Sequence, residues 1–281
     1  MTMPAIADAF ARVPREAFLG DGPWLIGEPG SGTYVATPDA SPVHLYRDVL
    51  IAIDAARELN NGQPSAHVKW IAAAAPAPGE SAFHLGTGTG YYTAILAELV
   101  GPRGRVVGCE IDPALAARAR ANLAAWPWAS VIDGDGTATG GMHDVIYVSA
   151  GATHPRREWL DALTPGGRLV MPITVHSPRF PSHGVGLMVR IDRPAPPSGG
   201  ADARGSPVIE RPAPPSGGPW PLTTVTQAGF IDCANTRDES LEPALRRMFA
   251  ITDPLVVVRE PHAPGDACLV HTAACCIQRA Q

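Results

Sequence analysis

A glycine-rich turn between an apolar strand and an apolar helix restricts the fold of this chain more than any other feature. The segment His84–Gly90 reads His-Leu-Gly-Thr-Gly-Thr-Gly, follows the apolar pair Ala82-Phe83 and leads directly into the apolar segment Tyr91–Leu99. Glycines at a spacing of two let the backbone fold tightly and leave room for a ligand, and the first turn of the following helix offers unpaired N–H groups. The segment Val106–Glu110 then reads as a second strand that ends in a carboxylate, which can accept hydrogen bonds from both hydroxyls of a ribose. Together these segments predict a site for a nucleoside-bearing cofactor.

Strands and helices are predicted to alternate through the centre of the chain. Strands are expected at residues 81–86, 105–110, 129–132, 143–149 and 167–173, and helices at 90–100, 113–125 and 155–163. This alternation predicts a Rossmann-like α/β fold with a mostly parallel, doubly wound sheet and helices on both faces. Ligands of such sheets bind beyond the carboxyl ends of the strands. The glycine turn, Glu110, Asp135 and residues 149–151 all fall at that edge, which predicts one shared site.

The flanking regions carry weaker signals. We expect helices at 4–12, 64–75 and 241–250, a loop at 20–42, a small strand in the first half of 48–59, and strands at 185–191, 254–259 and 267–271. The segment Arg193–Gly200 recurs as Arg211–Gly218, and such stiff proline-rich copies favour a duplicated surface loop over a partner-binding motif. The predicted parts are an N-terminal cap with a substrate segment at 1–78, a cofactor-binding core at 79–192, a Pro/Gly-rich repeat loop at 193–221, and a C-terminal extension at 222–281 that completes the sheet or covers the pocket.

Composition excludes several classes of protein. The chain has 281 residues with a formal net charge of −5, so it carries no electrostatic footprint for nucleic acid. Its five cysteines are scattered without a C-x-x-C motif, and no histidine cluster has metal-ligand spacing, so neither a metal site nor a disulfide scaffold is predicted. The N-terminus lacks the pattern of a signal peptide, and no apolar stretch is long enough to span a membrane. A cytoplasmic protein is expected.

The spacing of the glycines favours one type of cofactor. A dinucleotide fingerprint reads G-x-G-x-x-G, whereas this chain reads G-x-G-x-G and has Tyr91 where the third glycine of that fingerprint would stand. S-adenosylmethionine has no pyrophosphate, and the G-x-G-x-G turn resembles the first motif of Rossmann-like methyltransferases. A nicotinamide-dependent oxidoreductase is the less favoured alternative.

Further segments sharpen this resemblance. In order along the chain they are Val13–Leu19, Leu85–Leu99, the Gly-Asp-Gly turn within Asp133–Gly136, Asp144–Val148 and Leu163–Pro172. Their sequences and separations are similar to those of protein-L-isoaspartate O-methyltransferases over roughly residues 10–175. The resemblance implies a class I methyltransferase fold, S-adenosylmethionine as cofactor, and methyl transfer to a small-molecule or peptide acceptor, by O-methylation of a carboxylate in that family.

The pattern and the resemblance together assign roles to individual residues. Glu110 is expected to accept the ribose hydroxyls, and Asp135 a hydrogen bond from the adenine amino group. His67 aligns with a family histidine near the cofactor, whereas His84 replaces a family acidic residue and is either a neutral partner of the cofactor amino group or a core histidine. The candidate cofactor-binding residues are His67, His84, Gly86, Thr87, Gly88, Gly90, Glu110, Ile111, Asp135 and Gly136.

The segment before the core departs from the family. The family carries a Thr-Ile-Ser-x-Pro type of sequence there, and its hydroxyl residue contacts substrate and cofactor. Aligned on Pro64, the hydroxyl position is Gly62 in this chain. The candidate substrate-positioning residues are Asn60, Asn61, Gln63 and Ser65, for which turn and helix-cap chemistry is the competing explanation. The departure leaves three readings: a carboxylate methyltransferase with altered specificity, a methyltransferase of a hydroxyl or amine on a specialised metabolite or modified peptide, and a non-catalytic S-adenosylmethionine-binding module.

Overall fold

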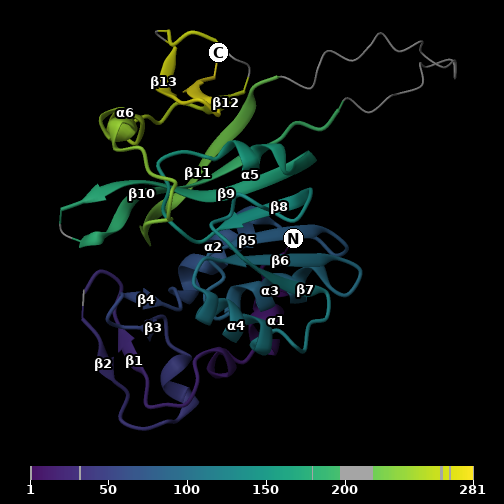
Figure 1. Cartoon of the computed structure of the whole chain (residues 1–281), viewed down its shortest axis with the longest axis vertical. Helices are drawn as coiled ribbons and strands as arrows, with labels where there is room; N and C mark the ends of the chain where they lie inside the picture. Colours follow the sequence, from purple (N-terminus) through teal and green to yellow (C-terminus); the bar gives the residue numbers. More distant parts are fainter. Residues whose placement is uncertain are drawn as a thin grey trace, which may run out of the picture.

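A ten-stranded sheet runs through most of the chain in the order β13-β14-β12-β11-β10-β9-β8-β5-β6-β7 (Figure 1). The computed structural model describes residues 2–31, 33–178, 180–196, 218–259, 262–265 and 267–280, without the side chains of 180–182. The duplicated repeat and the predicted loop at 193–221 lie mostly outside these residues.

One half of the sheet is parallel and the other half is antiparallel. The parallel half consists of β5 (Ser81–Leu85), β6 (Arg105–Glu110), β7 (Ala129–Asp133), β8 (His143–Val148) and β9 (Leu163–Ser177). The antiparallel half consists of β10 (Phe180–Asp192), β11 (Trp220–Ile231), β12 (Leu255–Val258), β13 (Cys268–His271) and β14 (Cys276–Arg279). The predicted α/β fold with a parallel central sheet is confirmed.

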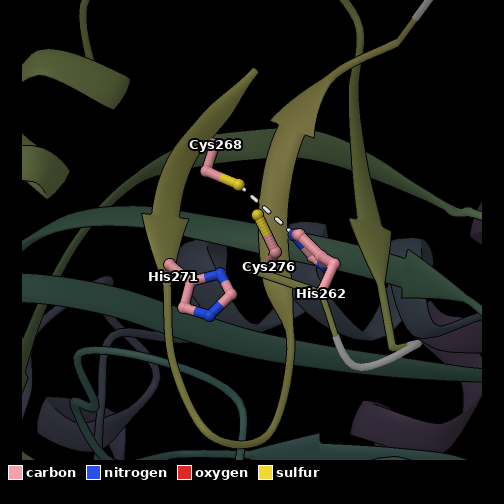
Figure 2. A group of neighbouring side chains, drawn as sticks. All are labelled: His262, Cys268, His271 and Cys276. Carbon is pink, nitrogen blue, oxygen red and sulfur yellow. Dashed lines mark hydrogen bonds between the residues drawn. The ribbon is translucent and has the colours of Figure 1, made fainter. Parts of the chain in front are cut away.

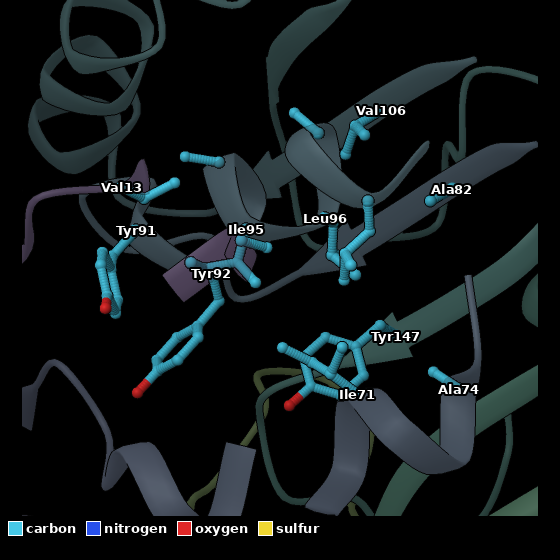
Figure 3. Close-up of a cluster of buried hydrophobic side chains, with 14 of the residues drawn as sticks. Val13, Ile71, Ala74, Ala82, Tyr91, Tyr92, Ile95, Leu96, Val106 and Tyr147 are labelled. Atoms are coloured by element: carbon cyan, nitrogen blue, oxygen red, sulfur yellow. The ribbon is translucent and has the colours of Figure 1, made fainter. Parts of the chain in front are cut away.

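Helices cover both faces of the sheet, as predicted. The helices α1 (Met3–Arg12), α2 (Pro64–Ala74), α3 (Tyr91–Val100) and α4 (Pro113–Asn122) pack on one face, and α5 (Arg157–Asp161) and α6 (Glu242–Met248) on the other. Neighbouring strand residues divide between two cores, because successive side chains of a strand point to opposite faces. Ala82 therefore joins the core under α3 (Figure 3), whereas Phe83 joins the core that contains Trp159 of α5.

The topology places a crevice between β5 and β8. The chain runs from β5 through α3 to β6 on one side, continues to β7, and returns to β8 on the other side of β5. The loops that follow β5 and β8 therefore leave the same sheet edge in opposite directions, which is where parallel sheets bind their ligands. In this chain those loops begin with Gly86 and Ser149.

A second, four-stranded sheet lies at the carboxyl edge of the parallel strands (Figure 1). Its order is β2 (Val35–Ala36), β1 (Leu25–Gly27), β3 (Leu50–Asp54) and β4 (Leu59–Asn60), with the short 3₁₀ helices Arg15–Phe18 and Pro42–Leu45 beside it. The expected small strand is β3. The prediction of a loop at 20–42 was wrong in part, because β1 and β2 lie there. These two strands pair over only a short stretch, so the surrounding glycine and proline residues dominate the local sequence pattern.

Other predictions differ from the structure in length or were missing. The expected helix at 155–163 is only Arg157–Asp161, because β9 already begins at Leu163. The long strand β11 was not predicted, since it contains Pro221 and Gly229 and its middle residues are only half-buried or exposed. Strand β14 also was not predicted. No helix in the described ranges is long and apolar enough to cross a membrane.

Candidate active site

The glycine turn adopts a backbone that other residues tolerate poorly. Gly86, Gly88 and Gly90 have φ angles of +79°, +56° and +99°. A Cβ atom on Gly86 would lie 3.1 Å from the Ser149 carbonyl oxygen, whereas one on Gly88 would meet only the Ile53 Cδ1 atom, at 3.6 Å. Gly86 is therefore needed for close packing of the two loops, and Gly88 presents open backbone toward the crevice.

Glu110 ends β6 directly beneath this turn. One carboxylate oxygen accepts a hydrogen bond from the Gly88 N–H at 2.7 Å, and the other accepts from the Asp112 N–H at 3.0 Å. Burial raises the pKa of Glu110, although these backbone donors oppose the shift. A carboxylate has about four acceptor positions, so Glu110 keeps capacity for ribose hydroxyls.

Asp135 lies in the Gly-Asp-Gly turn after β7. Its Oδ1 accepts hydrogen bonds from the Thr137 N–H at 3.0 Å and the Thr137 hydroxyl at 2.7 Å, and these bonds lower its pKa to about 2. Its Oδ2 lies 3.4 Å from Asn235 Nδ2 and 3.6 Å from an Arg156 guanidinium nitrogen. Asp135 is therefore ionised and anchored. The next residue, Gly136, accepts a hydrogen bond from the Trp159 indole at 3.0 Å.

A cavity of about 460 Å³ opens at the crevice between the small sheet and the parallel strands. Its walls include the predicted residues Asn60, Asn61, Gln63, His67, Gly86, Thr87 and Gly88. The predicted residues Ser65, His84, Gly90, Glu110, Ile111, Asp135 and Gly136 do not line it. Ile111 is 53% exposed. A surface hollow of about 580 Å³ beside α6 contains none of the predicted residues.

The antiparallel half supplies the opposite wall of the cavity. Val185 of β10 and the end of β11, residues 227–231, line it. The His183 ring nitrogen Nδ1 lies 3.6 Å from a carboxylate oxygen of Glu58, which joins β10 to the small sheet. The strand that contains Val185 was predicted, but its place in the cavity wall was not, and β11 itself was not predicted.

His67 occupies the place where a side chain at position 62 would lie. Its ring stacks on Tyr92 with centroids 3.5 Å apart, and its Nδ1 lies 2.8 Å from the Tyr147 hydroxyl. A Cβ atom on Gly62, whose φ is +27°, would be 2.3 Å from His67 Nε2. Burial lowers the pKa of His67 well below its usual value, so the ring is neutral. The glycine at the family's hydroxyl position and the buried ring of His67 are therefore sterically linked.

His84 is a buried histidine with both nitrogens engaged. Nδ1 lies 2.8 Å from the Thr93 hydroxyl and Nε2 lies 3.0 Å from the Ser149 hydroxyl. Burial lowers its pKa to about 3, so the ring is neutral. These contacts match the core-histidine alternative. They leave Ser149, which lines the cavity, as the group through which His84 can influence a ligand.

The polar segment before α2 is held by Arg15, which the sequence analysis had not assigned a role. Arg15 is 1% exposed, and its guanidinium donates to Asn61 Oδ1 at 2.8 Å and to the Asn61 and Gly62 carbonyls at 2.7 Å. It also donates to the carbonyl oxygens of Leu45 and Val49. The only signal for this anchor was the Val-Pro-Arg segment.

Two of the candidate substrate-positioning residues serve the start of α2. Asp48 accepts hydrogen bonds from the Ser65 N–H at 2.8 Å, the Ser65 hydroxyl at 2.7 Å and the Gln63 amide at 2.6 Å. This is helix capping by a distant carboxylate, which matches the competing explanation for Ser65. Asn60 and Gln63 remain as polar side chains on the cavity wall.

The glycine turn also holds an unsatisfied polar atom. The Thr89 hydroxyl is buried and has no hydrogen-bond partner among the described residues. Buried polar atoms without partners are rare and mark places where water or a ligand completes the structure. Groups of three or more potential metal ligands, within the part of the chain described, occur only on the β13–β14 hairpin, away from this cavity.

Sequence comparison connects these features to known proteins. The family model for protein-L-isoaspartate(D-aspartate) O-methyltransferase matches residues 35–180, just over half of the chain. A protein-L-isoaspartate O-methyltransferase of Aeropyrum pernix is 32% identical over 179 residues, which cover 62% of this chain and 61% of the relative. The corresponding protein of Ignicoccus hospitalis is 31% identical over 173 residues, which cover 60% of this chain and 72% of the relative.

Solved structures share the fold. A protein-L-isoaspartate O-methyltransferase superposes with a TM-score of 0.62 at 17% identity, covering 99% of this chain and 83% of the other. A Plasmodium falciparum protein described as a putative member, in complex with S-adenosyl-L-homocysteine, gives a TM-score of 0.53 at 14% identity, covering 82% of this chain and 89% of the other. On the matched segment and this fold, the chain belongs to the protein-L-isoaspartate(D-aspartate) O-methyltransferase family.

Proposed function

We propose that this chain is an S-adenosylmethionine-dependent methyltransferase that transfers a methyl group to a carboxylate of a peptide, with a specificity that differs from isoaspartyl repair. The single observation that carries the proposal is the cavity at the β5–β8 crevice. It is lined on one side by the glycine turn and on the other by the segment 60–67 that replaces the family's substrate segment.

The residues of the crevice fit the cofactor. Gly88 offers backbone with open space at its Cβ position, and Thr89 offers a buried hydroxyl without a partner among the described residues. We assign Glu110 to the ribose hydroxyls and Asp135 to the adenine amino group, with the remaining predicted cofactor residues around them. When bound, the cofactor supplies a methyl group that its sulfonium charge has already activated.

The electrostatics of the cavity suit a cationic cofactor. His67 and His84 are both neutral because burial lowers their pKa values, so neither ring repels a sulfonium. Glu110 and Asp135 place acceptors at the other end of the site. Since an activated methyl group needs no acid catalyst, the contribution of these residues is binding and alignment.

The acceptor side of the cavity carries the amides of Asn60 and Gln63, beside the acidic residues Glu28 and Glu58. Amides of this kind orient a carboxylate by donating hydrogen bonds. A carboxylate acceptor is already anionic and needs no general base. A hydroxyl or amine acceptor is the second candidate, and for it His67 is the base nearest to segment 60–63.

The altered specificity rests on Gly62 and His67. The family's hydroxyl position is glycine here, and the ring of His67 fills the space of its side chain. In our proposal residues 1–78 form the substrate-facing cap, 79–192 hold the cofactor, and 222–281 extend the sheet and wall the pocket.

The first test is transfer of a labelled methyl group from S-adenosylmethionine to three acceptor sets: an isoaspartyl peptide, peptides with other carboxylates, and small hydroxyl or amine compounds. Calorimetric cofactor binding is measured in parallel. We expect cofactor binding and label in a base-labile methyl ester of a carboxylate other than isoaspartate. Transfer to isoaspartyl peptide at the rate of a repair enzyme would contradict the altered specificity, and binding without transfer to any acceptor would favour the non-catalytic reading.

A further inference from the structure

Four side chains with metal-binding atoms meet at the outer edge of the antiparallel half. They are His262, Cys268, His271 and Cys276, and their ligand atoms all lie within 4.8 Å of one another. Figure 2 shows the two sulfur atoms between the two imidazole rings, with Cys268 on β13, Cys276 on β14 and His262 on the segment before β13. In sequence they follow the spacing H-x5-C-x2-H-x4-C.

A β-bulge brings Cys268 and His271 to the same face. Residues three apart in a regular strand point to opposite faces. Here His271 pairs with Cys276 and Cys268 pairs with Gln278, and the register shifts between Cys268 and Val270. Because paired residues share a face, and because Cys276 and Gln278 are two apart on β14, the bulge turns Cys268 toward His271 and Cys276.

The ligand atoms of the cluster lie close together, and one of them has no partner among the described residues. The Nε2 atom of His262 lies 3.3 Å from the sulfur of Cys268, and the two imidazole rings are nearly perpendicular, with centroids 5.0 Å apart. The Nδ1 atom of His271 is buried and has no hydrogen-bond partner within the described ranges. A buried nitrogen left without a partner is costly, and a cation would satisfy it.

Thiolate is the form of cysteine that binds metal, so binding of a cation at this cluster would displace the protons of both thiols.

We propose that His262, Cys268, His271 and Cys276 bind one structural zinc ion in a tetrahedral Cys2His2 site. Two thiolates and two imidazoles are the donor set that zinc favours over magnesium or calcium, which take oxygen ligands. Four protein ligands leave no open position, so the site is structural and not catalytic. Zinc–sulfur bonds of about 2.3 Å and zinc–nitrogen bonds of about 2.0–2.1 Å require the ligand atoms to lie roughly 3.3–3.8 Å apart, so the cluster needs only a small contraction.

Zinc bound at this site would stabilise the outer edge of the antiparallel half. β13 is the outermost strand, and edge strands with exposed backbone groups are prone to fraying and mispairing. Zinc would join β13, β14 and the connection from β12 at one point. It lies at the opposite end of the antiparallel half from the β5–β8 crevice, so this proposal does not depend on the proposed methyl transfer.

The test is metal analysis of the full-length protein purified under reducing conditions without added chelator. We expect about one zinc ion per chain, and after exchange with Co²⁺ a visible spectrum of tetrahedral coordination with sulfur-to-cobalt charge transfer. These measurements use the unmodified chain, so they do not depend on the folding of a variant. Less than a tenth of an equivalent of zinc together with no cobalt bands would overturn the proposal.

Substitution of the proposed ligands tests which side chains bind the zinc ion. Cys268→Ser and His271→Asn should each lose most of the zinc, whereas the matched control Cys275→Ala, next to Cys276 but buried in the core outside the cluster, should keep it. Equal zinc content in all three variants would overturn the assignment of ligands. A Cys268–Cys276 disulfide in freshly purified protein, with no zinc bound after reduction, would replace the metal site with a redox pair and would also overturn the proposal.

Discussion

The parallel and antiparallel halves of the large sheet differ in where their loops and chemically active side chains come together. In the parallel half, five neighbouring strands end at one edge, and the turns after β5, β6 and β7 converge there with Gly88, Glu110 and Asp135. In the antiparallel half, successive strands end at opposite edges, so no comparable convergence of loops arises. Its outer edge instead carries the cluster of four side chains formed by His262, Cys268, His271 and Cys276. The proposed cofactor site therefore lies at the edge of the parallel half, whereas the antiparallel half contributes a wall of the cavity and the proposed zinc site.

The largest expected effect comes from removing Arg15, whose hydrogen bonds join the segments 45–49 and 61–62 within the N-terminal cap. Arg15→Met should destabilise the protein by at least about 3 kcal/mol, because it leaves the buried carbonyls of Asn61, Gly62 and Val49 without their donor. Chemical denaturation measures the loss. Arg120→Met, which removes an exposed pair with Asp133, is the control and should change stability by no more than about 1 kcal/mol.

Hydrogen exchange then shows whether the halves respond separately. Under native conditions, Arg15→Met should increase exchange in residues 42–67 and leave the amides of β13 and β14 unchanged. Faster exchange in both regions to the same extent would mean that the cap and the antiparallel edge unfold together, which contradicts the distinction between the halves.

The next effect is a loss of stability at mildly acidic pH. His84 has a pKa of about 3 in the folded protein, below its ordinary value of 6.5, because burial disfavours the charged ring, and His67 is shifted in the same direction. The unfolded chain therefore binds more protons below pH 6.5. The stability from each neutral ring is complete above pH 6.5 and is lost as the pH falls toward the folded pKa, by about 1.4 kcal/mol per pH unit for each histidine.

Denaturation curves between pH 7 and pH 5.5 measure this slope. The buried His143 and the half-buried His154 also have lowered pKa values and add to the slope, so the informative quantity is the difference between variants. His84→Gln should reduce the slope by the share of one histidine. An unchanged slope in that variant would show that His84 is not neutral and buried in solution.

Substitution of Glu110 tests the proposed cofactor site directly. Glu110→Gln should weaken S-adenosylmethionine binding by roughly 1–3 kcal/mol, or about 5- to 150-fold in Kd, because a charged acceptor for ribose hydroxyls is lost. Asp133→Asn is the matched control, since Asp133 pairs with Glu110 across β6 and β7 and lies at the same edge, but is exposed. Calorimetry gives both values. Equal weakening in the two variants would remove Glu110 from the site.

The elements of the parallel half were predicted from the sequence more completely than those of the antiparallel half. In the parallel half, the apolar pattern predicted strand β6 with the observed bounds, and the glycine turn predicted the start of helix α3 within one residue. Pro113 correctly marked the start of α4. In the antiparallel half, β11 was missed because its pairing is long-range and its residues are only partly buried. Local patterns report burial and turns, whereas pairing between distant segments leaves little trace in either strand.

The site shows the same limit at the level of single residues. The glycine turn and Glu110 were found from local sequence, and they meet at one edge of the sheet as predicted; the hydrogen bond from the Gly88 N–H to Glu110 was not predicted. Arg15 and Asp48 hold the substrate segment through contacts with residues 15 to 47 positions away, so no local pattern could assign those roles. The bulge that aligns Cys268 with His271 also depends on a partner strand. In a regular strand a spacing of three places side chains on opposite faces, so the sequence alone does not bring these two residues together.

The smallest effect tests what separates this chain from its family at the functional edge. Gly62→Ser restores a hydroxyl at the family's position, but its Cβ would collide with His67 Nε2, 2.3 Å away. The control Gly79→Ser has a φ of +89° and no atom within 4 Å of its Cβ, so it reports backbone strain alone. We expect Gly62→Ser to cost about 1 kcal/mol more than Gly79→Ser.

A double-mutant cycle with His67→Ala completes the argument. If the clash is the cause, the cost of Gly62→Ser should shrink by about 1 kcal/mol once the ring is gone, because the two sites share one volume. The same double variant carries the family's hydroxyl without the clash, although it lacks the histidine that aligns with a family histidine. Gain of methyl transfer to isoaspartyl peptide in the double variant alone would locate the altered specificity in this pair. Additive costs with no gain would place it elsewhere on the cavity wall, where Asn60, Gln63 and the end of β11 remain.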